Sequence, residues 1–252
     1  MNEEANATRV DSIGAYNATN IGTVGVDIGA IKNPIVTTDY AYNIIDKSTN
    51  VFDISQTTAS LQTQWLSPSG ELKFDGVDDF LNIDSVVTPL ATTTIGTWAC
   101  WVKPSGVIND LEYFMSFGDT NADTHISLFK NSTGKLVLQG TEVGSNRLLI
   151  TTDASPFTLN TWTHIVVITD GVAVKLYADN VLVSQTDTSL DATEWFNSIV
   201  GLDNGRIGCV NKNSAGNTDH FNGSIAEPLI YNTNLTSSQI TDIYNYSLAT
   251  YS

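Results

Sequence analysis

The chain has 252 residues, a formal net charge of −16 and only 15% charged residues. This excess of negative charge repels phosphate backbones and anionic lipid surfaces, so we expect no nucleic-acid partner and no membrane insertion. The scarcity of Lys, Glu and Arg beside abundant Thr, Ser, Asn and Gly is typical of a β protein with polar turns and not of a helical bundle.

Residues 1–60 differ from the rest of the chain, because they hold no Trp and few other aromatic residues. The glycines of the apolar run 21–31 do not form a dinucleotide-binding motif, and no helical pattern follows them. We expect an extended arm over residues 1–60 and a domain over residues 61–252. The arm is expected to dock on a neighbouring subunit, which predicts a homo-oligomer. The acidic first ten residues precede no apolar h-region, so we expect no export signal.

The domain begins with ELKF (71–74) and FLNI (80–83), which flank the acidic turn DGVDD (75–79). Two short strands around a turn that contains Gly predict a hairpin. Residues 95–103 are apolar on both faces and end at Pro104, as expected for an interior strand. Further strand-like runs follow, each bounded by turn residues, at 112–117, 125–129, 135–139 and 147–152.

Three antiparallel strands are expected between residues 162 and 183. Residues 162–168 alternate, with apolar side chains on both faces, which predicts an interior strand. Asp170-Gly171 and Asp179-Asn180 then supply the positive φ angles that tight two-residue hairpins need. With the late runs 205–210 and 223–231, about a dozen strands at this spacing predict an all-β sandwich.

The last part of the chain departs from the two-residue period of a strand. Ile240, Ile243 and Tyr244 fall on one helical face, and Thr236 and Gln239 have the spacing of a capping box. We therefore expect a short helix over residues 235–246, packed on the sandwich.

The two cysteines, Cys100 and Cys209, lie in strand-like runs. A free Cys usually behaves as a small buried hydrophobe, whereas a disulfide needs a proximity of strands that the sequence does not show. We favour two buried thiols, and a bridge between them stays open.

Six segments carry a family resemblance when they are read in order: LKFDGVDDFLNI (72–83), TWACWVKPS (97–105), WTHIVVITDG (162–171), VKLYADNVLV (174–183), RIG (206–208) and FNGSIAEPLIYNTNLTSSQI (221–240). Together they are similar to the concanavalin A-like, laminin G type domain. The resemblance spans residues 70–246. It implies a jelly roll of two antiparallel sheets, with a calcium ion at one rim in many members. Its functions are mostly recognition of carbohydrate or protein, with some enzymes.

Calcium is the cofactor that this resemblance implies for the acidic turn. Asp75, Asp78 and Asp79 offer the hard oxygen ligands that calcium needs, and Glu227 completes the set if the first and last strands are neighbours. The alternative is an ordinary Asp-Gly turn with solvated carboxylates.

The chain departs from the family just before Glu227. Where the family commonly has Gly-x-Ile-Asp-Glu, this sequence has Ala226 in place of the Asp, so a carboxylate that often serves calcium is missing. Pro228 follows inside the expected strand and predicts either an edge or a bulge.

No catalytic residue is expected. The glucanases of this superfamily resemble one another in a Glu-x-Asp-x-x-Glu strand, because hydrolysis needs two carboxylates beside the scissile bond. No Glu of this chain begins that motif, and the three histidines have no metal-binding spacing. His164 is expected to be structural. Residues 119–130 begin like a calcium-binding EF-hand loop but lack its Gly and its final Glu, which predicts a hairpin loop.

Ligand binding on such a fold is expected in loops at one rim or on the concave face. An aromatic side chain beside Asn and Asp suits a sugar, since the apolar faces stack and the hydroxyls form hydrogen bonds. Trp195 is the candidate platform, although a Trp is more often a core or interface residue. The candidate ligand-binding residues are Trp195, Asn197, Asp203, Asn204, Arg206, Asp219 and His220.

Two functions remain open. The favoured one is a non-enzymatic structural, decoration or adhesion protein at the surface of a virus particle, most simply a bacterial virus. Its arm would dock on other particle subunits, and its domain would face host-surface glycans. The alternative is a secreted or cell-surface carbohydrate-binding module, and a glycan-active enzyme ranks third because it rests on fold analogy alone.

Overall fold

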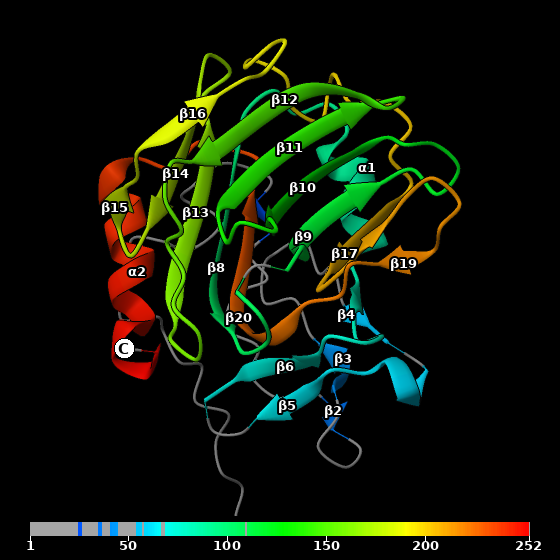
Figure 1. The fold of residues 1–252 in the computed structure, drawn as a ribbon, viewed down its shortest axis with the longest axis vertical. Helices are drawn as coiled ribbons and strands as arrows, with labels where there is room; N and C mark the ends of the chain where they lie inside the picture. The colour runs from blue at the N-terminus through cyan, green and yellow to red at the C-terminus, as the bar shows by residue number, and fades with distance from the viewer. Residues whose placement is uncertain are drawn as a thin grey trace, which may run out of the picture.

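The computed structural model describes residues 25–26, 35–36, 41–44, 54–56, 58–66, 69–108 and 110–251. Two antiparallel sheets form a sandwich, and the helix α2 (Ser237–Tyr251) lies against one side of it (Figure 1). This arrangement confirms the predicted all-β sandwich with a C-terminal helix. In the described part of the chain, no helix is long and apolar enough to cross a membrane.

The first sheet, sheet A, has the strand order β15-β14-β13-β8-β20-β6-β5. Because β8 lies between β13 and β20, the interior strand predicted at 95–103 is confirmed. The short strand β1 (Gly25–Val26) also pairs with β20. The other strands are β5 (Gln64–Leu66), β6 (Glu71–Asp75), β8 (Gly96–Pro104), β13 (Thr163–Thr169), β14 (Val174–Ala178), β15 (Val181–Leu182) and β20 (Asn222–Tyr231).

The second sheet, sheet B, has the order β16-β12-β11-β10-β9-β17-β7-β4-β3-β2. Its strands are β2 (Ile35–Val36), β3 (Ala41–Ile44), β4 (Ile54–Ser55), β7 (Leu81–Asn82), β9 (Glu112–Gly118), β10 (His125–Lys130), β11 (Leu136–Glu142), β12 (Ser145–Thr152), β16 (Gln185–Asp187) and β17 (Asn204–Ile207). Short helical segments are η2 (Ala59–Leu61), η3 (Asp84–Val86) and α1 (Val87–Leu90).

A small separate hairpin, formed by β18 (Val210–Asn211) and β19 (Asn217–Thr218), follows β17. Val210 of this hairpin packs with Tyr113, Phe129 and Val137, which form a cluster distinct from the main core. These three side chains therefore lie on the face of sheet B that points away from sheet A, and we call this side the outer face. The hairpin covers part of it.

The core between the sheets is built around Trp98 of β8. Its ring centroid lies 5.4 Å from that of Phe117, 5.3 Å from Trp195 and 5.8 Å from Phe196. Burying each such aromatic side chain contributes about 1.5–3 kcal/mol. Cys100 also lies in this core, and both it and Cys209 are buried and free, so the open possibility of a bridge is not realised.

The two turns of the 162–183 region differ. Asp179 and Asn180 adopt φ angles of 47° and 64° between the paired residues Ala178 and Val181, as a two-residue hairpin requires. The Asp170-Gly171 turn is longer than predicted, because it holds four residues between Thr169 and Val174. The Asp170 carboxylate accepts hydrogen bonds from the backbone N–H groups of Val172 at 3.0 Å and Ala173 at 2.9 Å, and so stabilises the longer form.

The expected hairpin around residues 75–79 is wrong. β6 belongs to sheet A, where it pairs with β20 and β5, and β7 belongs to sheet B, where it pairs with β17 and β4. The acidic turn therefore crosses from one sheet to the other at the rim of the sandwich. β6 and β7 each form their hydrogen bonds with strands of their own sheet and not with each other.

β20 shows how a proline is accommodated in a central strand. The register against β8 shifts between Ala226 and Leu229, and Glu227 has a φ of 46°, so Pro228 lies in a bulge. The predicted bulge is confirmed, whereas the edge position is not, because β20 lies between β8 and β6.

The C-terminal helix is longer than predicted. It begins after Thr236, whose hydroxyl accepts the backbone N–H of Gln239 at 3.3 Å, while the Gln239 side chain accepts the Thr236 N–H at 2.8 Å. These two bonds are the predicted capping box. The helix continues to Tyr251, because Tyr251 is buried against Trp101 and Trp162 of sheet A and its neighbouring loop.

The expected arm over residues 1–60 lies mostly outside the described residues. Its described parts are short strands that pair with the sandwich, β1 with β20 and β4 with β7. The boundary at residue 60 and the docking on another subunit stay predictions.

Candidate functional site

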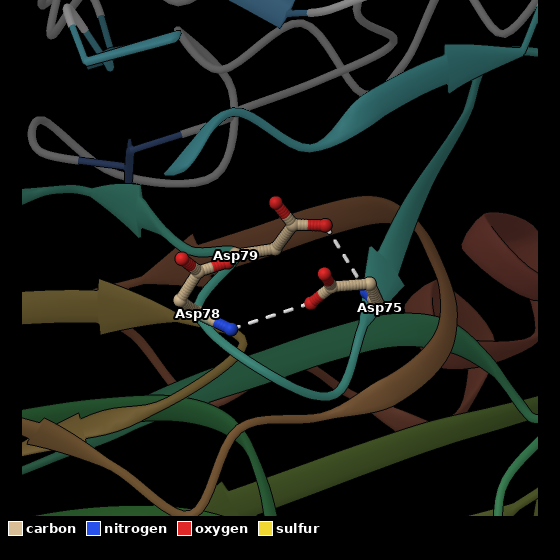
Figure 2. Close-up of side chains that lie close together, drawn as sticks. All are labelled: Asp75, Asp78 and Asp79. Atoms are coloured by element: carbon tan, nitrogen blue, oxygen red, sulfur yellow. Dashed lines mark hydrogen bonds between the residues drawn. The ribbon is translucent and has the colours of Figure 1, made fainter. Parts of the chain in front are cut away.

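The acidic turn gathers three carboxylates at the rim of the sandwich. One ligand oxygen from each of Asp75, Asp78 and Asp79 lies within 4.8 Å of the others (Figure 2). Asp75 accepts the backbone N–H groups of Val77 at 2.8 Å and Asp78 at 3.3 Å, and Asp79 accepts the N–H of Asp75 at 3.0 Å. Gly76 has a φ of 79°, and a β-carbon there would lie 2.7 Å from the Asn222 side chain. The turn is therefore held in shape by its own carboxylates and needs glycine.

The electrostatics of this turn favour a bound cation. The pKa of Asp79 is raised to about 7, chiefly by burial and also by the charges of Asp75 and Asp78, while the hydrogen bond from the N–H of Asp75 opposes the rise. A cation would relieve the repulsion among the three carboxylates, and carboxylate oxygens suit calcium. The three residues thus fit a calcium ion.

Glu227 does not belong to this cluster. In the register between β6 and β20, Asp75 lies opposite Asn222, and Glu227 is five residues further along β20, which corresponds to about 16 Å of strand. Glu227 instead lies near Tyr251 and contributes to the raised pKa of its hydroxyl. The first and last strands are neighbours as expected, but the register corrects the expectation that Glu227 completes the calcium site.

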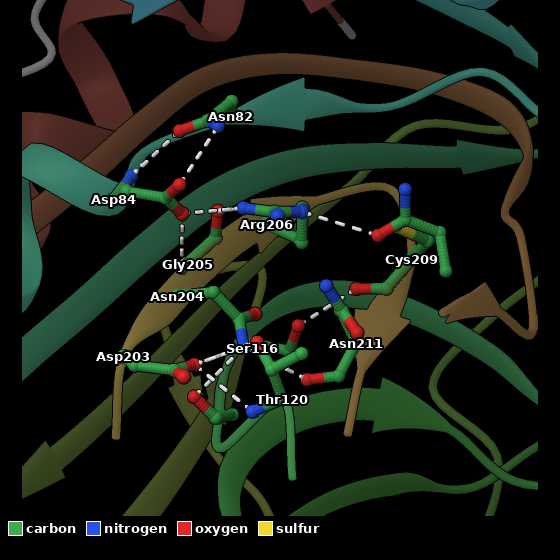
Figure 3. Close-up of polar contacts among 12 residues, drawn as sticks. Asn82, Asp84, Ser116, Thr120, Asp203, Asn204, Gly205, Arg206, Cys209 and Asn211 are labelled. Carbon is green, nitrogen blue, oxygen red and sulfur yellow. Dashed lines mark hydrogen bonds and ion pairs between the residues drawn. The ribbon is translucent and has the colours of Figure 1, made fainter. Parts of the chain in front are cut away.

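Arg206 of β17 lies on the outer face of sheet B and holds several segments together (Figure 3). Its Nη1 donates to the Asp84 carboxylate and, at 2.7 Å, to the main-chain oxygen of Gly205, and its Nε donates to Asn217 at 3.1 Å. The guanidinium also lies 5.4 Å from the ring centroid of Phe80. Arg206 therefore connects β17, the segment after β7 and the β18–β19 hairpin.

Asp203 and Asn204 form a second polar network at the start of β17 (Figure 3). The exposed Asp203 carboxylate accepts the N–H and the hydroxyl of Thr120 and the side-chain amide of Asn204, each at 2.9 Å. Burial raises the pKa of Asp203, but the hydrogen bonds from Asn204 and Thr120 outweigh it, so the pKa lies below its usual range. The Asn204 amide also donates to the main-chain oxygens of Gly118 at 2.9 Å and Asn211 at 3.1 Å.

His220 joins the end of the β18–β19 hairpin to the acidic turn. Its Nδ1 lies 3.2 Å from the main-chain oxygen of Asp79, and its Nε2 lies 3.3 Å from that of Asn217. Asp219 beside it is exposed, has a φ of 54°, and accepts the N–H of Tyr113 at its main-chain oxygen. The structure thus brings Arg206, Asp219 and His220 to the same side of the sandwich as the acidic turn.

With this geometry, comparison with known proteins identifies the family. Residues 75–241 match the model of the concanavalin A-like lectin/glucanases superfamily. The chain belongs to this superfamily. No curated protein sequence matches the chain.

Several solved structures share this fold at low sequence identity. A sialidase carbohydrate-binding module of Ruminococcus gnavus, the IT-sialidase CBM40, has a TM-score of 0.57 at 16% identity, over 70% of this chain and 98% of that one. The same module bound to α2,3-sialyllactose has a TM-score of 0.53 at 18% identity, over 61% and 84%. The receptor-binding domain of a botulinum neurotoxin C/D mosaic has a TM-score of 0.57 at 12% identity, over 80% and 48%.

The expectation that Trp195 is a sugar platform is wrong for this lectin-like domain. Its side chain is 1% exposed and packs against Trp98 and Phe196 in the core. The preceding Glu194 pairs with Arg147. Asn197 is exposed, and its backbone N–H donates to Thr93 at 3.1 Å. Residues 194–197 therefore close the core, and the structure does not bring them into the polar networks of the outer face.

Two other expectations agree with the structure. Residues 119–124 form the loop between β9 and β10, where the Asp119 carboxylate accepts the N–H groups of Asn121 and Ala122. His164 is buried between the rings of Trp101 and Tyr244, at centroid distances of 5.0 and 5.6 Å, and burial lowers its pKa to about 3. A structural role for His164 follows from this packing.

Sequence reasoning missed two residues of the outer face, His125 and Ser127. In the run 125–130 they alternate with Ile126 and Leu128, which point into the core. This alternation of polar and apolar residues was the sequence signal that places His125 and Ser127 on the face opposite the core. Burial lowers the pKa of His125 to about 4, Lys212 lowers it too, and Asp123 and Gln139 oppose them, so its imidazole is neutral at physiological pH.

Proposed function

We propose that this chain is a non-enzymatic carbohydrate-binding module that recognises glycans on the outer face of sheet B. The observation that carries the proposal is the row of buried polar side chains on this face, from Ser127 and Ser116 to Arg206, beneath the small β18–β19 hairpin. Hydroxyls of sugars are recognised by hydrogen bonds from such groups. The sialidase module of R. gnavus, which shares this fold, binds a glycan, α2,3-sialyllactose.

The absence of the Glu-x-Asp-x-x-Glu motif from the sequence supports a module without catalytic activity. We further propose that the acidic turn holds a calcium ion that stabilises the rim, since three carboxylates converge there.

Display of the module is a separate proposal. An extracellular or cell-surface location suits glycan binding. Display on a bacterial virus particle, with residues 1–60 docked on other subunits of a homo-oligomer, was the favoured interpretation of the sequence. None of the similarities above supports it, and we retain it as a prediction about where the module is carried.

A glycan array tests the proposed function. The chain is made multivalent, because binding at each single site is expected to be weak and gains strength through many copies. We expect selective binding to a set of related oligosaccharides. An array without any binding above that of a multivalent control protein would contradict the proposal.

A further inference from the structure

Buried polar atoms without a partner gather at one place on the outer face of sheet B. Within the described part of the chain, nine buried side-chain atoms have no hydrogen-bond partner, and five of them belong to His125, Ser127, Asn204 and Asn211. They are both ring nitrogens of His125, Oγ of Ser127 and the Oδ1 atoms of the two asparagines. The His125 ring still has two polar neighbours: the Gln139 side chain interacts with it and raises its pKa, although the Gln139 amide donates to Asn146 at 2.5 Å, and a carboxylate oxygen of Asp123 lies 3.9 Å from Nδ1 of His125.

The strand register explains why these residues meet. Gly118 of β9 lies between His125 of β10 on one side and Asn204 of β17 on the other. Ser127 lies opposite Ser116, two residues along the same strands. Directly paired residues of antiparallel strands point to the same face, so His125, Ser127 and Asn204 all point outward.

The β18–β19 hairpin covers this cluster closely. A β-carbon at Gly118 would lie 2.1 Å from the main-chain oxygen of Asn211, so only glycine lets the hairpin approach. Ser116 donates to the main-chain oxygen of Cys209 at 2.7 Å, which ties the start of the hairpin to the sheet (Figure 3). His125 is consequently 1% exposed and Ser127 is 0% exposed.

The hairpin itself is small, with two residues in each strand, and its tip is exposed. Asn213 and Ser214 at the tip have φ angles of 55° and 58°, and their backbone N–H groups donate to main-chain oxygens of the β9–β10 loop (Asp119, Thr120 and Ala122). Short segments of this kind open at lower free energy than the strands beneath them. Access to the cluster therefore requires the tip to release its hydrogen bonds to the β9–β10 loop and the ion pair of Lys212 with Asp123, while the sheet stays folded.

The chemistry of the cluster fits hydroxyl groups. A neutral imidazole offers one donor and one acceptor, Ser127 offers both, and the two asparagine oxygens accept. Buried polar atoms need partners, and a hydroxyl both donates and accepts. The nearby cations are already committed, because Arg206 pairs with Asp84 and Lys212 pairs with Asp123. The cluster thus offers no uncommitted cation for a carboxylate.

We propose that His125, Ser127, Asn204 and Asn211 form a binding site for a neutral, hydroxyl-rich sugar residue, entered when the hairpin tip moves aside. This inference rests on the proposed glycan-binding function and specifies its ligand class. It distinguishes the chain from the sialidase module, which is bound to sialyllactose, an acidic glycan.

The test compares neutral and acidic glycans on the multivalent chain. Lactose-terminated and other neutral oligosaccharides are arrayed beside their sialylated counterparts. We expect binding to neutral glycans and none that depends on the sialic acid. Binding that requires sialic acid would overturn this inference but support the proposed function. Binding to no glycan would overturn both.

Ser127→Ala separates a ligand-binding role from a structural one. The Oγ of Ser127 has no protein partner, so its removal should leave the melting temperature unchanged or higher, while affinity for the neutral glycan falls about tenfold, as expected for one lost hydrogen bond. Ser116→Ala is the contrast, because its hydroxyl has a protein partner and its loss should lower the melting temperature. A lower melting temperature for Ser127→Ala with unchanged glycan binding would mean that Ser127 serves a structural water only, and would overturn the site.

Discussion

The main-chain oxygen of Asp79 lies 3.2 Å from Nδ1 of His220, so the acidic turn and the end of the β18–β19 hairpin are in direct contact. The other ring nitrogen of His220 faces the main-chain oxygen of Asn217 at 3.3 Å. A neutral imidazole can donate to only one of these oxygens. His220 therefore connects the proposed calcium-binding turn to the β18–β19 hairpin, which covers part of the outer face.

We expect calcium to stabilise the folded chain, and to do so more at pH 8 than at pH 5.5. The pKa of Asp79 is raised to about 7 in the folded state, so its proton stabilises the fold at low pH and this contribution is lost as pH rises through 7. Calcium replaces the proton above that pH, and a ligand of the native state raises the melting temperature. Melting curves with calcium or with chelator at the two pH values check this.

Asp78→Asn and Asp79→Asn should each reduce the calcium-dependent rise in melting temperature. Asp79→Asn should also flatten the fall in stability between pH 5.5 and pH 8 that the chelated wild type shows. Asp110→Asn is the matched control, because Asp110 is an exposed carboxylate outside the cluster. Identical curves with calcium and with chelator in the wild type would reject the metal site.

Trp195 should matter for stability and not for binding. Trp195→Ala is expected to lower the free energy of unfolding by about 3–5 kcal/mol, because it leaves a cavity beside Trp98. Trp195→Phe keeps an aromatic ring there and should lower the free energy of unfolding by less. This variant should therefore stay folded and can be assayed for glycan binding. Denaturant unfolding and the glycan array measure the two effects. Wild-type stability with lost binding in Trp195→Phe would restore Trp195 as a sugar platform.

Both thiols should resist alkylation in the folded protein. Burial raises the pKa of Cys209 to about 12 and raises that of Cys100 as well, so neither forms the reactive thiolate at neutral pH. Iodoacetamide at pH 8 should label neither cysteine without denaturant and both in denaturant, as measured by mass spectrometry. Rapid labelling of either thiol under native conditions would show that its strand opens readily.

Removal of residues 1–60 tests the predicted arm. The strands of sheet A from β6 to β20 and those of sheet B from β7 to β17 all lie beyond residue 60. We expect the truncated chain to fold as a monomer that no longer assembles, as measured by circular dichroism and light scattering. Because β1 and β4 pair with the sandwich, an unfolded or aggregated product would place these residues inside the domain.

The sequence predicts most of the fold because strand alternation and turn residues are local signals. The interior strands, the hairpin at Asp179-Asn180 and the capping box at Thr236 all follow from such signals. The crossing of residues 75–79 between sheets was not predictable in this way, since it depends on which distant strands pair with β6 and β7.

The candidate site was predicted only in part. The three aspartates converge because they occupy one turn, whereas the placement of Glu227 depends on the register of two distant strands. Trp195 is buried because its loop folds back onto Trp98, and the local sequence does not reveal that path. His125 and Ser127 stand out only once sheet B and its hairpin are known.

The central claim is that a glycan binds to the outer face of sheet B, and a titration of the isotopically labelled chain with soluble neutral oligosaccharides tests it most directly. Nuclear magnetic resonance reports which backbone amides change on binding. We predict saturable changes at Ser116, Ser127, Asn204 and the hairpin that begins at Val210. Absence of any saturable change with every oligosaccharide, or changes confined to residues 194–197, would contradict the account.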